Sequence, residues 1–220
     1  GGVSFANVLV NDTYDSNPVV PTEITLEQIS TTNPGVTLNP LTGEVIVAPG
    51  TPEGNYELVY EICEIANPTN CDQATVTVPV SAAEIIANDD TGIPVNGYEG
   101  GVSVPNVLVN DELNSSPVDP AEITLEEISS TNPGVTLDPL TGEVIVAPGT
   151  PEGTYLLVYE ICEILNPTNC DQATVTVPVT APEIIANNDA GDPVNGYEGG
   201  TSVSDVLVND LLNGNSVAIA

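Results

Sequence analysis

The stretch Tyr56–Val78 reads YELVYEICEIANPTNCDQATVTV, and the stretch Tyr155–Val177 reads YLLVYEICEILNPTNCDQATVTV. In each stretch, apolar and polar residues alternate on both sides of an Asn-Pro-Thr-Asn turn, which is the pattern of a hairpin with one buried face. Proline stands at the second position of this turn, where its fixed φ is favoured. The pattern predicts two antiparallel strands in which the large side chain of Tyr60 packs opposite the small side chain of Ala74.

The same register places two pairs of cysteines opposite one another at the hairpin tips. We predict the disulfides Cys63–Cys71 and Cys162–Cys170, both on the polar face, unlike the buried disulfide that joins the sheets of antibody domains. Closing a loop of this size stabilises a fold by about 2.5 kcal/mol in the loop-closure model. Free thiols or half of a metal site are the alternatives, although the CxxC spacing and the histidines of such sites are absent. Disulfides would imply an oxidising location outside the cytosol.

The hairpin belongs to a repeat of 99 residues. Residues 1–99 and 100–198 are identical at 80 of 99 positions, without insertion or deletion. A unit of this length is a domain rather than one turn of a solenoid. We predict three parts: residues 1–86, a repeat without its opening segment; residues 87–185, a complete repeat; and residues 186–220, the start of a third.

Isolated strands are marginal in water, so the third part requires other strands to cover it. We expect the chain to be a window on a longer periodic polypeptide that supplies the missing strands at both ends. Strand exchange with a second molecule is the alternative.

Short strands separated by Gly and Pro fill the rest of each unit. In the first repeat we predict them at Val3–Val10, Ile24–Ile29, Val36–Leu38 and Glu44–Ala48, besides the hairpin. The segment Asn39–Gly43 favours a tight turn, because Gly43 can adopt a positive φ. The predicted fold class is all-β: tandem immunoglobulin-like β-sandwich domains in a linear array.

The composition excludes several classes of function. The chain has 32 acidic residues and no Lys, Arg or His. It therefore lacks the basic surface that nucleic acids and anionic membranes require, and we expect neither as a partner. Without His or Lys it has no imidazole base and no Schiff-base amine, so we assign no catalytic residue and expect no enzyme. With no Trp and one Phe, little could stack on a sugar in a carboxylate-pair hydrolase.

Acidic and amide residues gather where one repeat passes into the next. Carboxylate, amide and backbone oxygens are the ligands of Ca²⁺, which is the one cofactor that this pattern suggests. The alternative is a solvated acidic face in which Asn-Asp pairs only make turns. Asn188 replaces Asp89 in the next repeat, which argues against a fixed ligand set. Both interpretations stay open, and the candidate ligands are Glu84, Asn88, Asp89, Asp90, Asn110 and Asp111.

The series A-N-D-D, N-V-L-V-N-D, P-G-V-T-L-D-P-L-T-G-E-V and G-T-Y-L-L-V-Y-E-I-C resembles the tandem cadherin-like and immunoglobulin-like repeats of giant bacterial surface adhesins. The cysteine hairpin is similar to repeats in large surface proteins of Bacteroidota, including gliding adhesins. The resemblance covers essentially the whole chain. It implies a long stalk, exported by the type IX system, that presents adhesive regions away from the cell. Members of this group usually carry some Lys or Arg, and this chain carries none.

Three functions follow as hypotheses. The first is a stalk segment of an extracellular cell-surface adhesin, whose partners are neighbouring repeats, with surface or host ligands bound by other regions. The second is a subunit of a self-assembling extracellular filament. The third is a ligand-binding module, for which Tyr98 and Tyr197 are the only aromatic candidates. A net charge of −32 favours an extended array that salt or divalent cations would stabilise.

Overall fold

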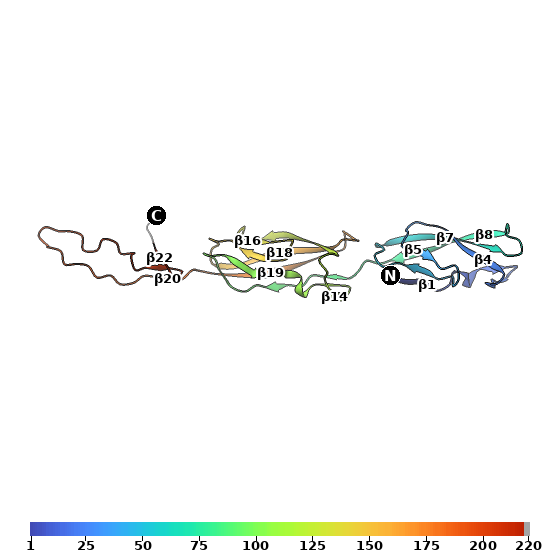
Figure 1. Ribbon diagram of the computed structural model, residues 1–220, viewed down its shortest axis with the longest axis horizontal. Helices are drawn as coiled ribbons and strands as arrows, with labels where there is room; N and C mark the ends of the chain where they lie inside the picture. The colour runs from blue at the N-terminus through green and yellow to red at the C-terminus, as the bar shows by residue number, and fades with distance from the viewer. Residues whose placement is uncertain (218–220) are drawn as a thin grey trace. The chain divides into compact units, whose positions relative to one another are not determined.

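The computed structural model describes residues 1–217 (Figure 1). These residues divide into two compact units, and each is described by itself. The first consists of Gly1–Ile85, Glu112–Thr124 and Cys162–Asp171, and the second of Ile86–Asp111, Leu125–Ile161 and the described residues from Gln172 onwards. Among the described residues, no helix has the length and apolar character needed to cross a membrane.

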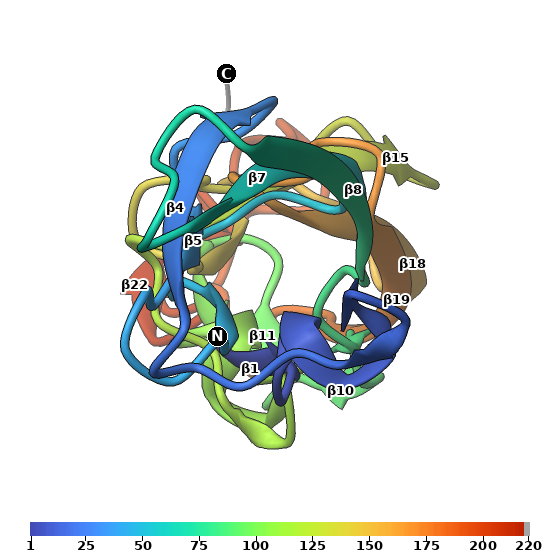
Figure 2. The same cartoon turned by 90° about the vertical axis from the view of Figure 1, so that its right-hand side faces the viewer.

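Two facing sheets form the first repeat. One has the strand order β1-β6-β5 and the other β4-β7-β8, while β2 and β3 pair as a small hairpin. Figure 2 shows β7 and β8 on one side of this repeat and β1 on the other. The elements are β1 (Gly2–Phe5), the 3-10 helix η1 (Val8–Asn11), β2 (Thr13–Tyr14), β3 (Asn17–Pro18), β4 (Ile24–Thr31), β5 (Val36–Leu38), β6 (Val45–Val47), β7 (Gly54–Glu64) and β8 (Cys71–Val80).

The long hairpin has the register that the sequence predicts. Tyr60 lies opposite Ala74, and Cys63 lies opposite Cys71. Alternate residues therefore face inward and pack with the other sheet, which makes the repeat an immunoglobulin-like β-sandwich. The buried core of the first repeat consists of Val8, Leu9, Ile24, Val36, Leu38, Val45, Leu58, Tyr60 and Val78.

The expectation of one strand over Val3–Val10 is wrong in its second half. Strand β1 ends at Phe5, and Val8–Asn11 form a 3-10 turn. The cause is Asn7, whose side-chain oxygen accepts a hydrogen bond from the backbone N–H of Leu9 at 3.0 Å. Such local side-chain bonds compete with strand pairing. Elsewhere in the first repeat the predicted strands are found, with boundaries that differ by at most two residues at either end.

The second repeat has the same two sheets and additional pairing. One sheet has the order β12-β17-β16, and the other the order β10-β19-β18-β15, with β11 also paired to β19; β9, β13 and β14 form a third. The elements are β9 (Ile85–Ile86), β10 (Asp90–Thr91), β11 (Val95–Asn96), β12 (Gly101–Val104), η2 (Val107–Asn110), β13 (Glu112–Leu113), β14 (Ser116–Pro117), β15 (Ile123–Ser130), β16 (Val135–Leu137), β17 (Val144–Val146), β18 (Gly153–Glu163) and β19 (Cys170–Thr180).

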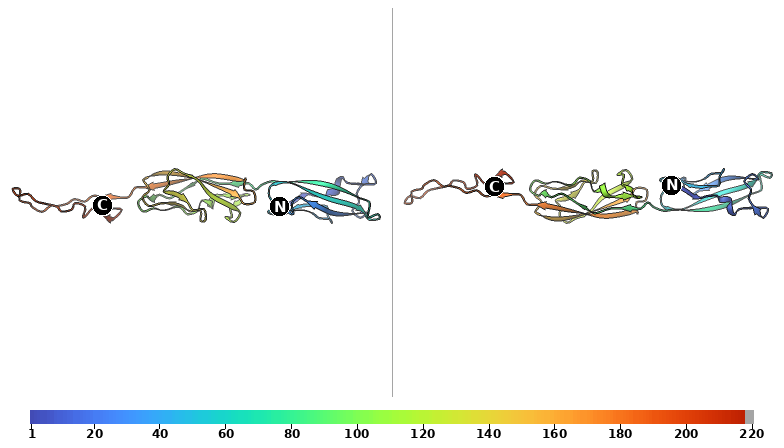
Figure 3. Two further views of the ribbon diagram at one scale, coloured as in Figure 1. Left: turned by 90° about the horizontal axis from the view of Figure 1, so that it is seen from above. Right: turned by 90° about the horizontal axis from the view of Figure 1, so that it is seen from below.

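Residues 184–217 contain one small sheet. It has the order β20-β21-β22, where β20 is Ile184–Ile185, β21 is Leu211–Leu212 and β22 is Asn215–Ser216. This stretch is drawn in brown to red in Figure 3. Val206 and Val208 are 56% and 74% exposed, so no second sheet covers them among the described residues. The proposed repeat boundaries, and the continuation of the polypeptide at both ends, stay predictions.

Candidate functional site

A buried carboxylate lies at the end of the 3-10 turn of the second repeat. The side chain of Asn106 caps η2 by accepting a hydrogen bond from the N–H of Leu108 at 2.9 Å. The turn closes when the N–H of Asp111 donates to the carbonyl of Leu108. This geometry carries Asp111 into the sandwich, where it is 1% exposed. A charge buried this deeply requires polar partners.

The phenol of Tyr159 is the central partner of this carboxylate. Its oxygen lies 3.1 and 3.0 Å from Oδ1 and Oδ2 of Asp111, 3.1 Å from the carbonyl oxygen of Asn88 and 3.4 Å from Oδ2 of Asp90. Burial, followed by the charges of the two carboxylates, raises the pKa of Tyr159 well above its usual value. The phenol therefore stays protonated and acts as a donor throughout the physiological pH range.

Two asparagines join the opening of the repeat to the 3-10 turn. The backbone N–H of Asn88 donates to Asp111 at 2.7 Å, and its side-chain amide donates to the carbonyl of Asn110, also at 2.7 Å. In return, the amide of Asn110 donates to the carbonyls of Asn88 and Asp89 at 3.4 and 3.2 Å. These reciprocal bonds hold two segments that are about twenty residues apart in sequence.

Asp89 and Asp90 attach the same segment to the last strand. Oδ1 of Asp89 accepts from the backbone N–H of Thr174 at 2.8 Å, and Asp90 lies beside Val175 in a parallel pairing. Burial, and after it the charge of Asp111, raises the pKa of Asp90 to about 6, although the hydrogen bond from Tyr159 opposes the shift. We call the group formed by Asn88, Asp89, Asp90, Asn110, Asp111 and Tyr159 the clasp.

The clasp contains five of the six candidate calcium ligands. The sixth, Glu84, lies outside the clasp. Its backbone carbonyl accepts a hydrogen bond from the N–H of Asn114, and its side chain is exposed. Only Asp90 and Asp111 bring carboxylates near Tyr159, and both accept hydrogen bonds there. Calcium usually takes six to eight oxygen ligands. The carboxylate oxygens of Asp90 and Asp111 are used as hydrogen-bond acceptors that join parts of the repeat. Calcium binding stays a prediction.

In the described residues, two groups of three acidic or cysteine side chains have their ligand atoms close together, and both groups lie outside the clasp. They are Glu61 with Cys63 and Cys71, and Glu160 with Cys162 and Cys170. Both cysteine pairs are joined as disulfides, with Cα atoms 4.1 Å apart, so their sulfurs are not thiolate ligands. The pairings are those expected from the hairpin register.

Some hydrogen bonds of the clasp recur at the equivalent positions elsewhere in the chain. In the first repeat the hydroxyl of Tyr60 donates to Asp12 at 2.8 Å, as that of Tyr159 does to Asp111. After residue 186, the backbone N–H of Asn187 donates to Asp210 at 2.7 Å, as that of Asn88 does to Asp111. Tyr159 is not among the residues selected from the sequence. The signal that could have found it is that a tyrosine and an aspartate recur together 99 residues apart, as Tyr60 with Asp12 and Tyr159 with Asp111.

The aromatic residues proposed for ligand binding lie on exposed turns. Tyr98 is 49% exposed and Tyr197 is 99% exposed. The backbone N–H of each donates to an asparagine two residues earlier, Asn96 and Asn195, which is a local turn.

The fold and the clasp together define an all-β protein of repeated immunoglobulin-like sandwiches. No protein-family model and no curated protein matches the sequence. Similar solved structures are cadherin ectodomains. They include protocadherin gamma B2 domains 3–6 (15% identity, TM-score 0.37, 72% of this chain and 43% of that one), mouse cadherin-23 domains EC22–24 (16%, 0.34, 72% and 53%) and the human desmocollin-1 ectodomain (12%, 0.30, 76% and 37%). The matched region spans less than two thirds of each of these chains.

Proposed function

We propose that this chain is a load-bearing spacer in the stalk of an extracellular bacterial surface adhesin. The observation that carries the proposal is the way in which the second repeat is closed. Its opening strands β10 and β11 run parallel to its last strand, with Asp90 beside Val175 and Val95 beside Val179. A repeat whose first and last strands pair in parallel is well suited to resist tension applied between its two ends.

The physical reason lies in the direction of loading. The start of an opening strand and the end of a parallel last strand lie at opposite ends of their pairing. Tension between them shears all the intervening hydrogen bonds together, instead of opening them one at a time. The clasp adds further bonds at the start of the segment, where Asn88 binds both Asp111 and Asn110.

The disulfides support an extracellular location, because such bonds persist in oxidising compartments. They also hold the tips of the hairpins in register. Export by the type IX system and attachment to the cell surface follow from the resemblance to Bacteroidota adhesins, and neighbouring repeats would be the direct partners. Surface or host ligands would bind to other regions of the same protein.

Labelling of intact cells tests this function. Antibodies against the second repeat should label unpermeabilised cells of the source organism, and external protease should remove the label while a cytosolic marker stays intact. Reduction of surface extracts should release free thiols from the repeats. Label that appears only after permeabilisation would contradict the proposal.

A filament subunit is the second candidate. A filament would appear by electron microscopy as a polymer of separate chains, whereas a stalk would consist of one long polypeptide.

A further inference from the structure

The hairpin tip of the second repeat, residues 163–169, is hydrogen-bonded to residues of the first repeat and of the linker that follows it. Oδ1 of Asn166 accepts from the backbone N–H of Glu53 at 2.6 Å, and the side-chain amide of Asn169 donates to the carbonyl of Ala83 at 2.8 Å. All four residues belong to the first compact unit. Asn166 is only 9% exposed, although turns usually face water. Its burial indicates that the tip is a contact surface.

One buried carboxylate sets the direction of both asparagines. Oε2 of Glu163 accepts from the amide of Asn166 at 2.8 Å and from the amide of Asn169 at 3.0 Å. An asparagine donates through Nδ2 and accepts through Oδ1. Because Nδ2 of Asn166 is turned towards Glu163, its Oδ1 is directed to the N–H of Glu53. Glu163 is 7% exposed in a chain without side-chain cations, so neutral amides satisfy its charge.

The internal bonds of the tip are the same in both repeats. In the first repeat Oε2 of Glu64 accepts from Asn67 at 3.0 Å and from Asn70 at 3.1 Å. These bonds, in that order, and then one from Tyr14 hold the pKa of Glu64 below its usual value. In each repeat a disulfide joins the two strands at the base of the tip. The sequence of the tip therefore encodes a defined shape, and the disulfide restrains it.

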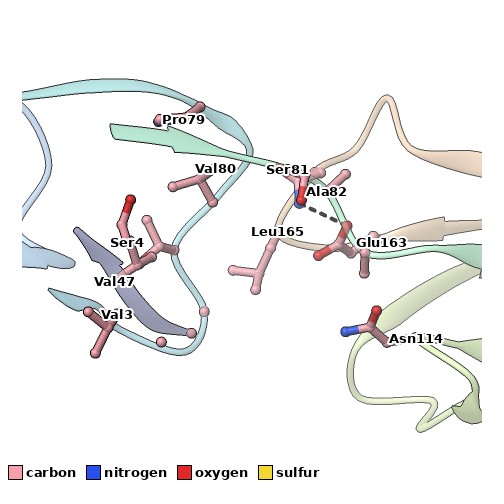
Figure 4. Close-up of a pocket in the computed structure, with 16 residues that line it drawn as sticks. Val3, Ser4, Val47, Pro79, Val80, Ser81, Ala82, Asn114, Glu163 and Leu165 are labelled. Carbon is pink, nitrogen blue, oxygen red and sulfur yellow. Dashed lines mark hydrogen bonds between the residues drawn. The ribbon is translucent and has the colours of Figure 1, made fainter. Parts of the chain in front are cut away.

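An apolar side chain adds to the contact. Leu165 points into a hollow whose walls include Val47 and Val80 (Figure 4). A Cβ placed on Gly50 would lie 3.9 Å from Cδ1 of Leu165, which is van der Waals distance. The first repeat has Ala66 at the position of Leu165. The apolar part of the contact can therefore be changed without altering the hydrogen bonds of the tip.

Each repeat carries both surfaces of this contact. Residues 163–169 recur as residues 64–70 with a single difference, and the turn at residues 49–54, which contains Glu53, recurs unchanged at residues 148–153. An interface between two different surfaces of the same domain is heterologous, and it can be repeated from one copy to the next along an array.

We propose that the disulfide-clamped tip of each repeat is a docking element for the repeat that precedes it, and that the disulfide keeps the tip in the shape that docks. A turn that is already ordered loses less conformational entropy when it binds. The inference rests on the proposed spacer function and deepens it, since it names the surface through which neighbouring repeats bind.

Hydrogen exchange at the Glu53 amide tests the contact on the 220-residue chain, because this N–H belongs to the first repeat and its acceptor to the second. Asn166→Ala should accelerate exchange about fivefold or more, the factor expected for one lost hydrogen bond. Leu165→Ala gives the tip the residue of the first repeat, so it should fold normally, and it should accelerate exchange to a smaller degree. Thr168→Ala, at an exposed position of the same tip, is the matched control and should leave exchange unchanged.

The double variant Cys162→Ser/Cys170→Ser tests the role of the clamp. Exchange at Glu53 should accelerate in this variant too, although the missing disulfide lies in the other repeat. The amides of Leu58 and Val78, in the core of the first repeat, should exchange as in the parent chain.

Three results would overturn the proposal. Unchanged exchange at Glu53 in Asn166→Ala would mean that the tip does not dock, and unchanged exchange in the double cysteine variant would mean that the clamp does not shape it. Equal acceleration at Leu58 and Val78 would mean that the first repeat is loosened as a whole. None of these results would bear on the location of the protein at the cell surface, which the labelling of intact cells tests separately.

Discussion

At the scale of single residues, the second repeat depends on one phenol among carboxylates. The hydroxyl of Tyr159 is the donor that allows Asp111 to be buried, and Asn88 supplies a second N–H to the same carboxylate. A chain without Lys, Arg or His has no side-chain cation to neutralise such a group. Neutral donors therefore take over that role, and their loss leaves an unsatisfied buried charge.

Tyr159→Phe should lower the free energy of unfolding of the second repeat by about 1–3 kcal/mol, because Asp111 loses a buried donor. Tyr155→Phe is the matched control. Its hydroxyl donates to the carbonyl of Pro151 at an exposed site, and its removal should change stability by no more than about 0.5 kcal/mol. Scanning calorimetry of both variants measures the difference, and equal losses would refute the role given to the clasp.

The raised pKa of Asp90 predicts how the stability of the second repeat changes with pH. Its pKa is about 6 in the folded protein, against an ordinary value of 3.8, because of burial and the neighbouring charge of Asp111. Asp89 adds to the shift, and the hydrogen bond from Tyr159 opposes it. The folded state therefore binds the proton more tightly, so this group's contribution to stability is full below pH 4 and is lost as the pH rises through 6.

At pH 7 the buried Asp90 carboxylate is ionised at a cost to the folded state, so Asp90→Asn should remove that cost and raise the melting temperature, with chelator present to exclude divalent cations. The two proteins should converge towards pH 4. A variant that melts lower than the parent at pH 7 would show instead that the ionised carboxylate is required, as a bound cation would require it.

At the scale of structural elements, the disulfide hairpins are independent clamps. The double variant Cys63→Ser/Cys71→Ser should destabilise the first repeat by about 2.5 kcal/mol through the greater freedom of its unfolded chain. Calorimetry should show one transition lowered and the other unchanged. An equal shift of both transitions would indicate that the repeats unfold as one cooperative unit.

The elements that the sequence predicts well are those with a clear alternation of apolar residues. The hairpin register, from Tyr60 opposite Ala74 to Cys63 opposite Cys71, follows from that alternation and the proline turn. The 3-10 turn after Asn7 was missed, because its apolar run VLV also suits a strand. Strands β10 and β11 were missed too, since each has two residues and pairs with β19, a strand distant in sequence.

The clasp could be predicted only in part, because its members come from segments that are distant in sequence. Asn88, Asp89, Asp90, Asn110 and Asp111 could be selected as a polar cluster near a repeat boundary. Their actual partners, Tyr159 and Thr174, are some 50 to 85 residues away, and only the folded sheet brings them together.

At the scale of the whole molecule, the charge sets the response to salt. The chain has a formal charge of −32 and no side-chain cation, so its acidic groups repel without compensation. Raising NaCl from low to physiological concentration shortens the screening length to about 8 Å and should raise both melting temperatures. A chain whose melting temperature is independent of salt would contradict this view of its surface. Added Ca²⁺ at matched ionic strength should raise them further only if the calcium prediction holds.

The central claim is that an opening segment, paired in parallel with the last strand, locks a repeat against tension. Single-molecule force spectroscopy on the chain, pulled from its two ends, tests it most directly. Gly97→Ala should lower the unfolding force of the second repeat, because its Cβ would meet the carbonyl oxygen of Thr150 at 2.0 Å and separate the segment from β19. Gly196→Ala, which meets no atom within 4 Å, should leave that force unchanged. If Gly97→Ala unfolds at the force of the parent chain, the lock does not bear the load.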